Sequence, residues 1–215
     1  MQLISVNIGQ KRNLQNGIKL ETTGIFKFST NGHVRVTKLG LKDDVICDTR
    51  NHGGPDQAVY IYGDVDYAWW SKELGRELSP GTFGENLTIS GLESAGFRIG
   101  DHLNIGPVIL EVSSPRFPCS TLAARMGDPK FIQRFRQAER PGLYCRVIQA
   151  GIIQVGEDVK IEKYINESVP LLDVFRSHYE KDKSEDSIWR QLKSPIAIRI
   201  RMDLENELHK FLEQK

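Results

Sequence analysis

The sequence predicts a mainly β protein of the α+β class: a closed or partly closed β-barrel with flanking helices, followed by a small C-terminal domain of three helices. Roughly ten short apolar runs alternate with turn residues in the first part of the chain, which is typical of a barrel. Two helix-like runs interrupt them. Beyond residue 163 the apolar spacing becomes helical. We therefore predict a barrel domain over 1–163 and a helical domain over 164–215.

The N-terminal part of the chain is predicted to be a β-meander. Apolar residues from Leu3 to Ile8 alternate with polar ones, and further short runs cover 18–29 and 33–45. The pair Asn31-Gly32 separates the last two runs and is a hairpin turn signal.

Two helical segments interrupt the predicted strands. Asp64 can cap a helix that runs to Leu74 and stops at Gly75. The second segment opens at Leu122, stops at Gly127 and restarts after an Asp-Pro pair. Its strand neighbours are predicted over 103–105, 108–112, 142–148 and 152–161.

The C-terminal segment carries three serine-initiated helical stripes. We expect helices over 168–179, 184–192 and 199–212. Helices of about ten residues form only a thin core by themselves. The tail is therefore expected to pack on the barrel or on a second subunit, so that a homodimer is one candidate assembly.

Composition narrows the classes of partner. The chain has 215 residues, a formal net charge of +1 and three cysteines. A nearly neutral chain has no general attraction for nucleic acid. The N-terminus lacks the pattern of a signal peptide, and no apolar run is long enough for a membrane span. We expect a cytoplasmic protein that binds small molecules, with no nucleic acid and no membrane as partners.

Four loops carry chemically useful residues. Lys11 and Arg12 follow the first strand, where two cations meet an anion or simply form a solvated turn. The other loops read H-G-G-P-D from His52, F-G-E-N-L from Phe83 and P-R-F-P-C ending at Cys119. Because a barrel collects its loops at its ends, we expect these four to converge on one rim.

Cys119 is the candidate reactive thiol. It precedes a predicted helix and follows Arg116 by three residues. A helix N-terminus and a guanidinium both favour the thiolate and lower the pKa of a cysteine. The alternative is a small buried core residue. Cys145 lies within a predicted strand and Cys47 shows no partner spacing, so both are interpreted as structural.

Five motifs in order resemble the MOSC family, and together with the three-helix tail they resemble its bacterial YiiM type. They are H-G-G-P-D at 52–56, F-G-E-N-L at 83–87, I-G-D at 99–101, P-R-F-P-C at 115–119 and G-L-Y-C-R-V at 142–147. The resemblance covers nearly the whole chain and implies a MOSC-type β-barrel.

The resemblance also implies that the barrel binds the molybdenum cofactor, with Cys119 as the protein ligand to the metal. His52 and Asn86 are expected to hydrogen-bond the pterin or to orient its ligands. The cofactor phosphate requires cations, and the candidates are Lys11, Arg12, Arg116 and Arg146. The sequence departs from many members at Gln57, where they carry Lys or Arg, which weakens the case for a phosphate contact there.

Proteins of this type reduce N-hydroxylated compounds, including hydroxylaminopurine base analogues, to amines. The resemblance therefore implies a molybdenum-dependent oxidoreductase in which His52 serves as proton donor, a role that Asp56 or water could also fill. The sequence carries neither cluster cysteines nor a flavin motif. A separate flavoprotein-type reductase is accordingly the expected electron donor.

Two other classes of function stay open at this point. The first is a carrier that holds the cofactor, or a sulfur on Cys119, without reductase activity of its own. The second is a metal-free thiol enzyme that uses Cys119 as nucleophile and His52 as base.

Overall fold

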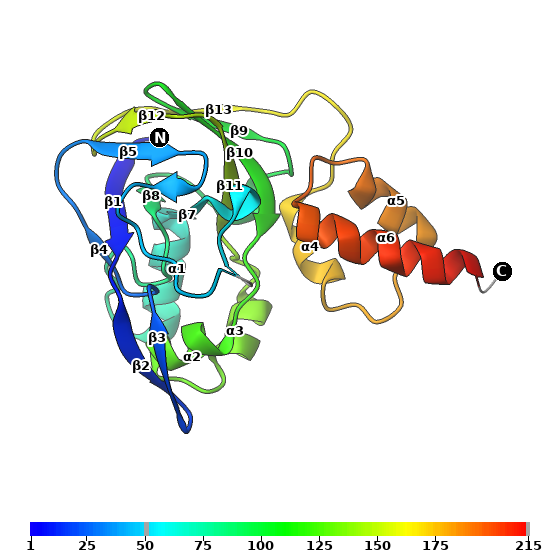
Figure 1. Ribbon diagram of the computed structural model, residues 1–215, viewed down its shortest axis with the longest axis horizontal. Coiled ribbons are helices and arrows are strands. Elements are labelled where there is room, and N and C mark those ends of the chain that lie inside the picture. The colour runs from blue at the N-terminus through cyan, green and yellow to red at the C-terminus, as the bar shows by residue number, and fades with distance from the viewer. Residues whose placement is uncertain (50–51, 214–215) are drawn as a thin grey trace.

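An eight-stranded mixed sheet curves around the core of the computed structural model, which describes residues 1–49 and 52–213 (Figure 1). The strand order is β13-β9-β10-β11-β7-β8-β1-β4. Only the β7–β8 pair in this sheet is parallel among the described residues. In that order the strands are Val159–Glu162, His102–Ile105, Val108–Pro115, Leu143–Gln149, Val59–Gly63, Leu87–Ile89, Leu3–Gly9 and Lys27–Ser29.

The two ends of the strand order approach each other without forming a continuous ladder of paired strands. The N–H of Leu3 donates to the carbonyl oxygen of Glu157 (2.9 Å), and the N–H of Gly156 donates to the carbonyl oxygen of Leu3 (2.8 Å). These bonds join the start of β1 to the residues just before β13. The sheet is therefore barrel-like and only partly closed in the described chain, which agrees with the predicted mainly β, α+β class.

The predicted N-terminal meander is wrong in its pairing. β2 (Arg12–Asn16) and β3 (Lys19–Thr23) form a separate hairpin, and β5 (Val34–Thr37) pairs with β6 (Gly40–Leu41) and β12 (Gly151–Ile153). The strands that flank Asn31-Gly32 do not pair with each other, because β4 pairs with β1 instead. Pairing with β12 buries the inward side chains of β5, so burial overrides the local turn signal.

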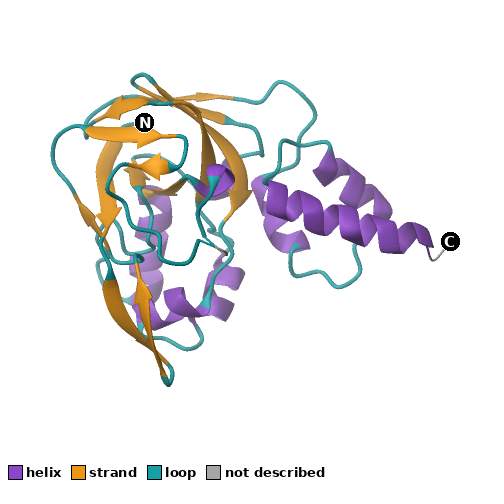
Figure 2. Ribbon diagram, in the orientation of Figure 1, coloured by secondary structure: helices purple, strands orange, loops and turns teal. Residues whose placement is uncertain are grey.

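Three helices lie toward one end of the barrel (Figure 2), and buried residues of all three belong to one aromatic cluster. They are α1 (Asp64–Leu74), α2 (Ser120–Met126) and α3 (Phe131–Ala138). Trp70 and Phe83 are fully buried between them, so the helical insertions supply core packing. Gly75 and Gly127 end α1 and α2 in the left-handed conformation (φ 63° and 68°), as the sequence predicts.

The C-terminal helices pack beside β10 (Figure 1). They are α4 (Leu171–Ser177), α5 (Glu185–Leu192) and α6 (Ile198–Glu213). Ser184 caps α5, because its hydroxyl accepts a hydrogen bond from the N–H of Ser187 (3.2 Å). Leu171, Ile188 and Leu204 belong to the same buried cluster as the barrel strands. The tail is thus held on the barrel, while the division at residue 163 stays a prediction.

Two short 3-10 turns complete the fold, η1 (Pro55–Gln57) and η2 (Ser94–Gly96). Within the described part of the chain, every helix is too short or too polar to cross a membrane.

Candidate functional site

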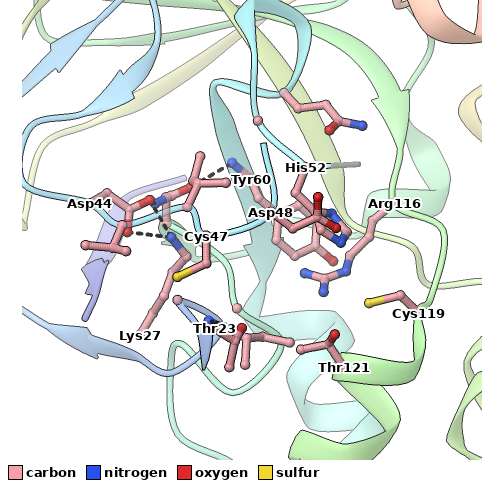
Figure 3. Close-up of a pocket in the computed structure, with 18 of the residues that line it drawn as sticks. Thr23, Lys27, Asp44, Cys47, Asp48, His52, Tyr60, Arg116, Cys119 and Thr121 are labelled. Carbon is pink, nitrogen blue, oxygen red and sulfur yellow. Dashed lines mark hydrogen bonds and ion pairs between the residues drawn. The ribbon is translucent and has the colours of Figure 1, made fainter. Parts of the chain in front are cut away.

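A cleft of about 150 Å³ opens among the loops at one rim of the barrel (Figure 3). Its walls come from β3 and the residues after it, from the segment 44–48, and from three of the loops that the sequence singles out. The lining residues used below are Gly24, Lys27, Asp44, Cys47, His52, Gly53, Gln57, Tyr60, Gly84, Asn86, Arg116 and Cys119.

Three of the four predicted loops converge here. The H-G-G-P-D, F-G-E-N-L and P-R-F-P-C motifs all contribute lining residues. The fourth loop does not, since Lys11 and Arg12 lie outside the described lining of the cleft. The guanidinium of Arg12 lies 4.5 Å from the ring centroid of Phe28 instead. A phosphate contact for these two cations therefore stays a prediction without geometric support.

Cys119 is the N-cap residue of α2 and is half-buried at the cleft wall. Burial by itself raises the pKa of a thiol. That effect is outweighed by a hydrogen bond with His52, by the positive charge of Arg116 and by the backbone N–H of Leu122, which together lower the pKa of Cys119 to about 6. Cys119 is therefore mostly thiolate at pH 7.

Arg116 is the fixed positive charge beside the thiolate. Its side chain is 4% exposed, and its Nη1 donates to the carbonyl oxygen of Phe83 (2.7 Å). The guanidinium lies 4.9 Å from the ring centroid of Tyr60. Its buried Nε has no hydrogen-bond partner. An unpaired buried donor is costly, so this atom is available to an acceptor placed in the cleft.

A buried polar group that the sequence did not single out forms the opposite wall of the cleft. The carboxylate of Asp44 accepts hydrogen bonds from Lys27 Nζ (2.6 Å), from Asn86 Nδ2 (2.8 Å) and from the N–H of Gly9 (2.7 Å). Lys27 is 8% exposed. No local signal marked it, because alternation in Phe26-Lys27-Phe28 predicts that Lys27 faces solvent, whereas the structure buries Lys27 and exposes Phe28.

Asn86 and Arg146, both predicted to contact the cofactor, are engaged with other protein groups. The side-chain oxygen of Asn86 accepts from the N–H of Tyr60 (3.1 Å), while its nitrogen bonds Asp44. Asn86 lines the cleft and fixes its wall. Arg146 lies outside the described lining and pairs with Asp56 and Glu111, each at 2.9 Å. These pairs neutralise Arg146, so its role toward a phosphate stays a prediction.

The other two cysteines differ in environment. Cys145 lies in β11 and is buried, and burial raises its pKa, in accord with the structural interpretation. Cys47 lines the cleft, on the side of Lys27, whereas Cys119 lies on the side of Arg116 (Figure 3). No spacing signal marked Cys47 as a residue of this cleft, because only the fold brings the two cysteines to the same cleft.

The donor set of the cleft limits the kind of metal group that it can hold. No cluster of three or more His, Cys, Asp or Glu side chains suited to a metal ion occurs among residues 1–49 and 52–213. A metal at Cys119 would thus have a thiolate from the protein and bring its other ligands with it. The unpartnered Nε of Arg116 suits an anionic part of such a group. The residues present therefore fit a metal carried on an anionic organic cofactor.

Glycines keep the walls of the cleft close together. A Cβ at Gly24 would lie 1.9 Å from the carbonyl oxygen of Val45, and one at Gly84 would lie 3.4 Å from Nη1 of Arg116. Gly84 also has a φ of +75°. A side chain at either position would thus collide with or crowd a neighbouring part of the wall.

Comparison with known proteins agrees with this geometry. The MOSC domain family model matches residues 48–160, more than half of the chain. The protein YflK of Bacillus subtilis, described as uncharacterized, is 32% identical over 191 residues, which cover 88% of this chain and 86% of that protein. YiiM of Escherichia coli is 31% identical over 144 residues, covering 65% of this chain and 63% of that protein.

A protein of Gibberella moniliformis named "Reductase" is 32% identical over 144 residues, covering 65% of this chain but 26% of that longer protein. The crystal structure of YiiM from Geobacillus stearothermophilus superposes with a TM-score of 0.79 at 25% identity, covering 96% of this chain and 98% of that one. The family is associated with binding of the molybdenum cofactor. The chain belongs to the MOSC domain family and is of the YiiM type.

Proposed function

We propose that this protein is a molybdenum cofactor-dependent oxidoreductase that reduces N-hydroxylated compounds to amines, with Cys119 as the protein ligand to molybdenum. The observation that carries the proposal is the lowered pKa of Cys119, about 6, inside a cleft shared with His52 and Arg116. A cysteine binds a metal as the thiolate, and this environment supplies a thiolate at neutral pH. The resemblance to a protein named reductase supports the class of activity.

The chain's own residues divide the binding tasks. Cys119 Sγ would hold the metal, and Arg116 Nε would pair with an anionic group of the cofactor. Lys27 is paired with Asp44 in the opposite wall, so this pair shapes the cleft without adding net charge. When bound, the cofactor supplies the two-electron chemistry, and the protein supplies binding, orientation and electrostatics.

The reaction also needs protons. Conversion of R–NHOH to R–NH₂ and water consumes two electrons and two protons, and the nitrogen–oxygen bond breaks as the oxygen leaves in water. His52 lines the cleft that holds Cys119, so its imidazole is within the site and can serve as a proton donor there. A flavoprotein-type reductase is proposed as the source of the electrons.

Metal analysis tests the cofactor assignment. Wild-type protein, Cys119→Ala and Cys47→Ala are purified from a host that makes molybdenum cofactor. We expect about one molybdenum per chain in the wild type and in Cys47→Ala, and none in Cys119→Ala, because both thiols line the cleft but only Cys119 is at a helix N-terminus beside Arg116. Equal molybdenum in Cys119→Ala would overturn the ligand assignment.

A reduction assay then separates an enzyme from a carrier. The molybdenum-loaded protein is mixed with a hydroxylaminopurine, a flavoprotein reductase and its reduced nicotinamide donor, and amine formation is measured. Amine formation that requires Cys119 supports the reductase. Full molybdenum content without turnover, when a known active relative turns over under the same conditions, supports the carrier alternative.

A further inference from the structure

A second cavity, of about 700 Å³, lies between the barrel and the C-terminal helices. Its walls are the loop at 53–57, the start of the P-R-F-P-C loop, and α4 and α6 with their connections. This volume is in the range of small-molecule sites. The lining residues that matter here are Gly53, Gly54, Gln57, Ser114, Phe117 and His178.

One wall of this second cavity is a stack of flat rings. The rings of Phe117 and His178 are 3.8 Å apart between centroids and 23° from parallel. Phe175 continues the stack on Phe117, at 5.9 Å and 2°. Burial, with the nearby charge of Lys183, lowers the pKa of His178, so its ring is neutral at pH 7. An uncharged aromatic wall of this kind favours a planar ring as ligand.

Polar atoms without partners lie on the same cavity. The hydroxyl of Ser114 and the side-chain oxygen of Gln57 are buried and have no hydrogen-bond partner. Ser114 is 1% exposed. A native structure leaves few such atoms unsatisfied, so a ligand that supplies hydrogen-bond donors would complete them. The aromatic wall and these acceptors together describe a heteroaromatic ring with polar edges.

The charged side chains that line this cavity do not favour a charged ligand. Lys183, which is 10% exposed, is paired with Glu207 at 2.7 Å. Asp56 is paired with Arg146 and also accepts the N–H of Ile198 (2.6 Å). Arg199, Asp203 and Lys210 also line the cavity, so that three basic and three acidic side chains balance there and neither sign of charge is in excess. The ligand is therefore expected to be neutral.

The loop at 53–57, called the Gly53–Gly54 divider below, separates this cavity from the cleft of Cys119. Gly53 and Gln57 line both cavities, and the preceding residue, His52, lines the cleft that holds Cys119. Gly53 and Gly54 have no side chains, and a Cβ at Gly54 would meet nothing within 4 Å. A ligand in the second cavity can therefore extend an exocyclic group over these glycines toward the thiolate.

We propose that the cavity between the barrel and the C-terminal helices is the substrate-ring pocket of this protein, which takes a neutral planar heteroaromatic ring against Phe117 and His178 and directs its N-hydroxyl group over the Gly53–Gly54 divider. This assignment deepens the proposed function and rests on it for the identity of the reacting group. It gives the helical tail a direct role in the site.

Binding of the fluorescent base 2-aminopurine tests the pocket without turnover. The probe is titrated into full-length wild type, His178→Ala, His178→Phe, Ser114→Ala and Cys119→Ala. His33→Ala, at an exposed position between β4 and β5, is the matched control. We expect His178→Ala to weaken binding about tenfold and Ser114→Ala about three- to tenfold. His178→Phe, which keeps the stacking surface, should bind within about twofold of the wild type, as should the control and Cys119→Ala.

Any of three results would overturn the assignment of this pocket. The first is that the wild type shows no saturable binding of 2-aminopurine, and the second is that His178→Ala and Ser114→Ala both bind it with unchanged affinity. The third result is that His178→Phe loses binding to the same extent as His178→Ala. Because the probe binds through its ring, the result does not depend on molybdenum: binding with no turnover would sink the proposed function and leave the pocket standing. With a loaded, active enzyme, His178→Ala should raise KM and leave kcat within about twofold.

Discussion

Replacing His52 with alanine should raise the pKa of Cys119 and remove most of its thiolate near neutral pH. The hydrogen bond from His52 is the largest of the effects that offset burial and bring this pKa to about 6. A hydrogen bond to a charged group contributes about 1.5–3 kcal/mol, and one pKa unit corresponds to about 1.4 kcal/mol. Loss of His52 should therefore raise the pKa of Cys119 by about one to two.

This rise in pKa changes the thiolate fraction strongly at pH 6.5, because that pH lies between the pKa of Cys119 in the wild type and the pKa expected in His52→Ala. At pH 6.5 a pKa of about 6 corresponds to roughly three quarters thiolate, whereas a value near 7.5 would leave about a tenth. The alkylation rate of Cys119 at that pH should fall several-fold in His52→Ala.

The folded state favours the thiolate, so the stability that it contributes is present above the unfolded pKa, near 8.5, and is lost as pH falls through about 6.

The assay follows iodoacetamide modification of Cys119 by peptide mass spectrometry from pH 5 to 9. It uses cofactor-free protein in a Cys47→Ala background, so that the other thiol of the cleft does not react. His33→Ala serves as the control histidine variant. An alkylation profile with its midpoint unchanged in His52→Ala would refute the assignment of His52 as the main partner of the thiolate.

Three further substitutions test the walls of the cleft and the core beneath it. Lys27→Met should cost about 3–5 kcal/mol in urea unfolding because it leaves the buried carboxylate of Asp44 without its cation, and adding Asp44→Asn should recover part of that loss. Burial raises the pKa of Glu85 above its ordinary value of 4.5, so the stability contributed by the protonated form is lost as pH rises through the raised pKa, and Glu85→Gln should flatten the decline of stability as pH rises. Gly24→Ala would bring a Cβ to 1.9 Å from the carbonyl oxygen of Val45 in the cleft wall, so molybdenum content should fall, while Gly96→Ala, with nothing within 4 Å, should retain it.

The local environment of Cys119 was predictable because its determinants are close together in sequence. The helix that follows it and Arg116, three residues before it, can be recognised from residue order alone, and both lower its pKa in the structure. The same holds for α1 and α2, whose glycine stops lie directly at their ends. Signals that are local in the sequence therefore predicted these two helices and the pair of Cys119 and Arg116 in the site.

Contacts between distant segments were not predictable in the same way. Asp44 meets Lys27 and Asn86 only because β4 pairs with β1, beside β8, and the residues after β6 fold back across them. Arg146 faces Asp56 and Glu111 because β11 pairs with β10 in one particular register. A shift of one residue would turn its side chain to the other face of the sheet, and the sequence does not specify that register locally.

The pairing of the strands also explains why one short loop serves two cavities. The segment from His52 to Gln57 enters β7, a central strand whose neighbours are β8 and β11. β8 brings the F-G-E-N-L loop to one side of it, and β10, beyond β11, brings Cys119 and the docked helices to the other. The loop is therefore fixed between the thiolate and the helical tail. A substrate held against the tail and a metal held by Cys119 would meet at this loop, where Gly53 and the side chain of Gln57 line both cavities.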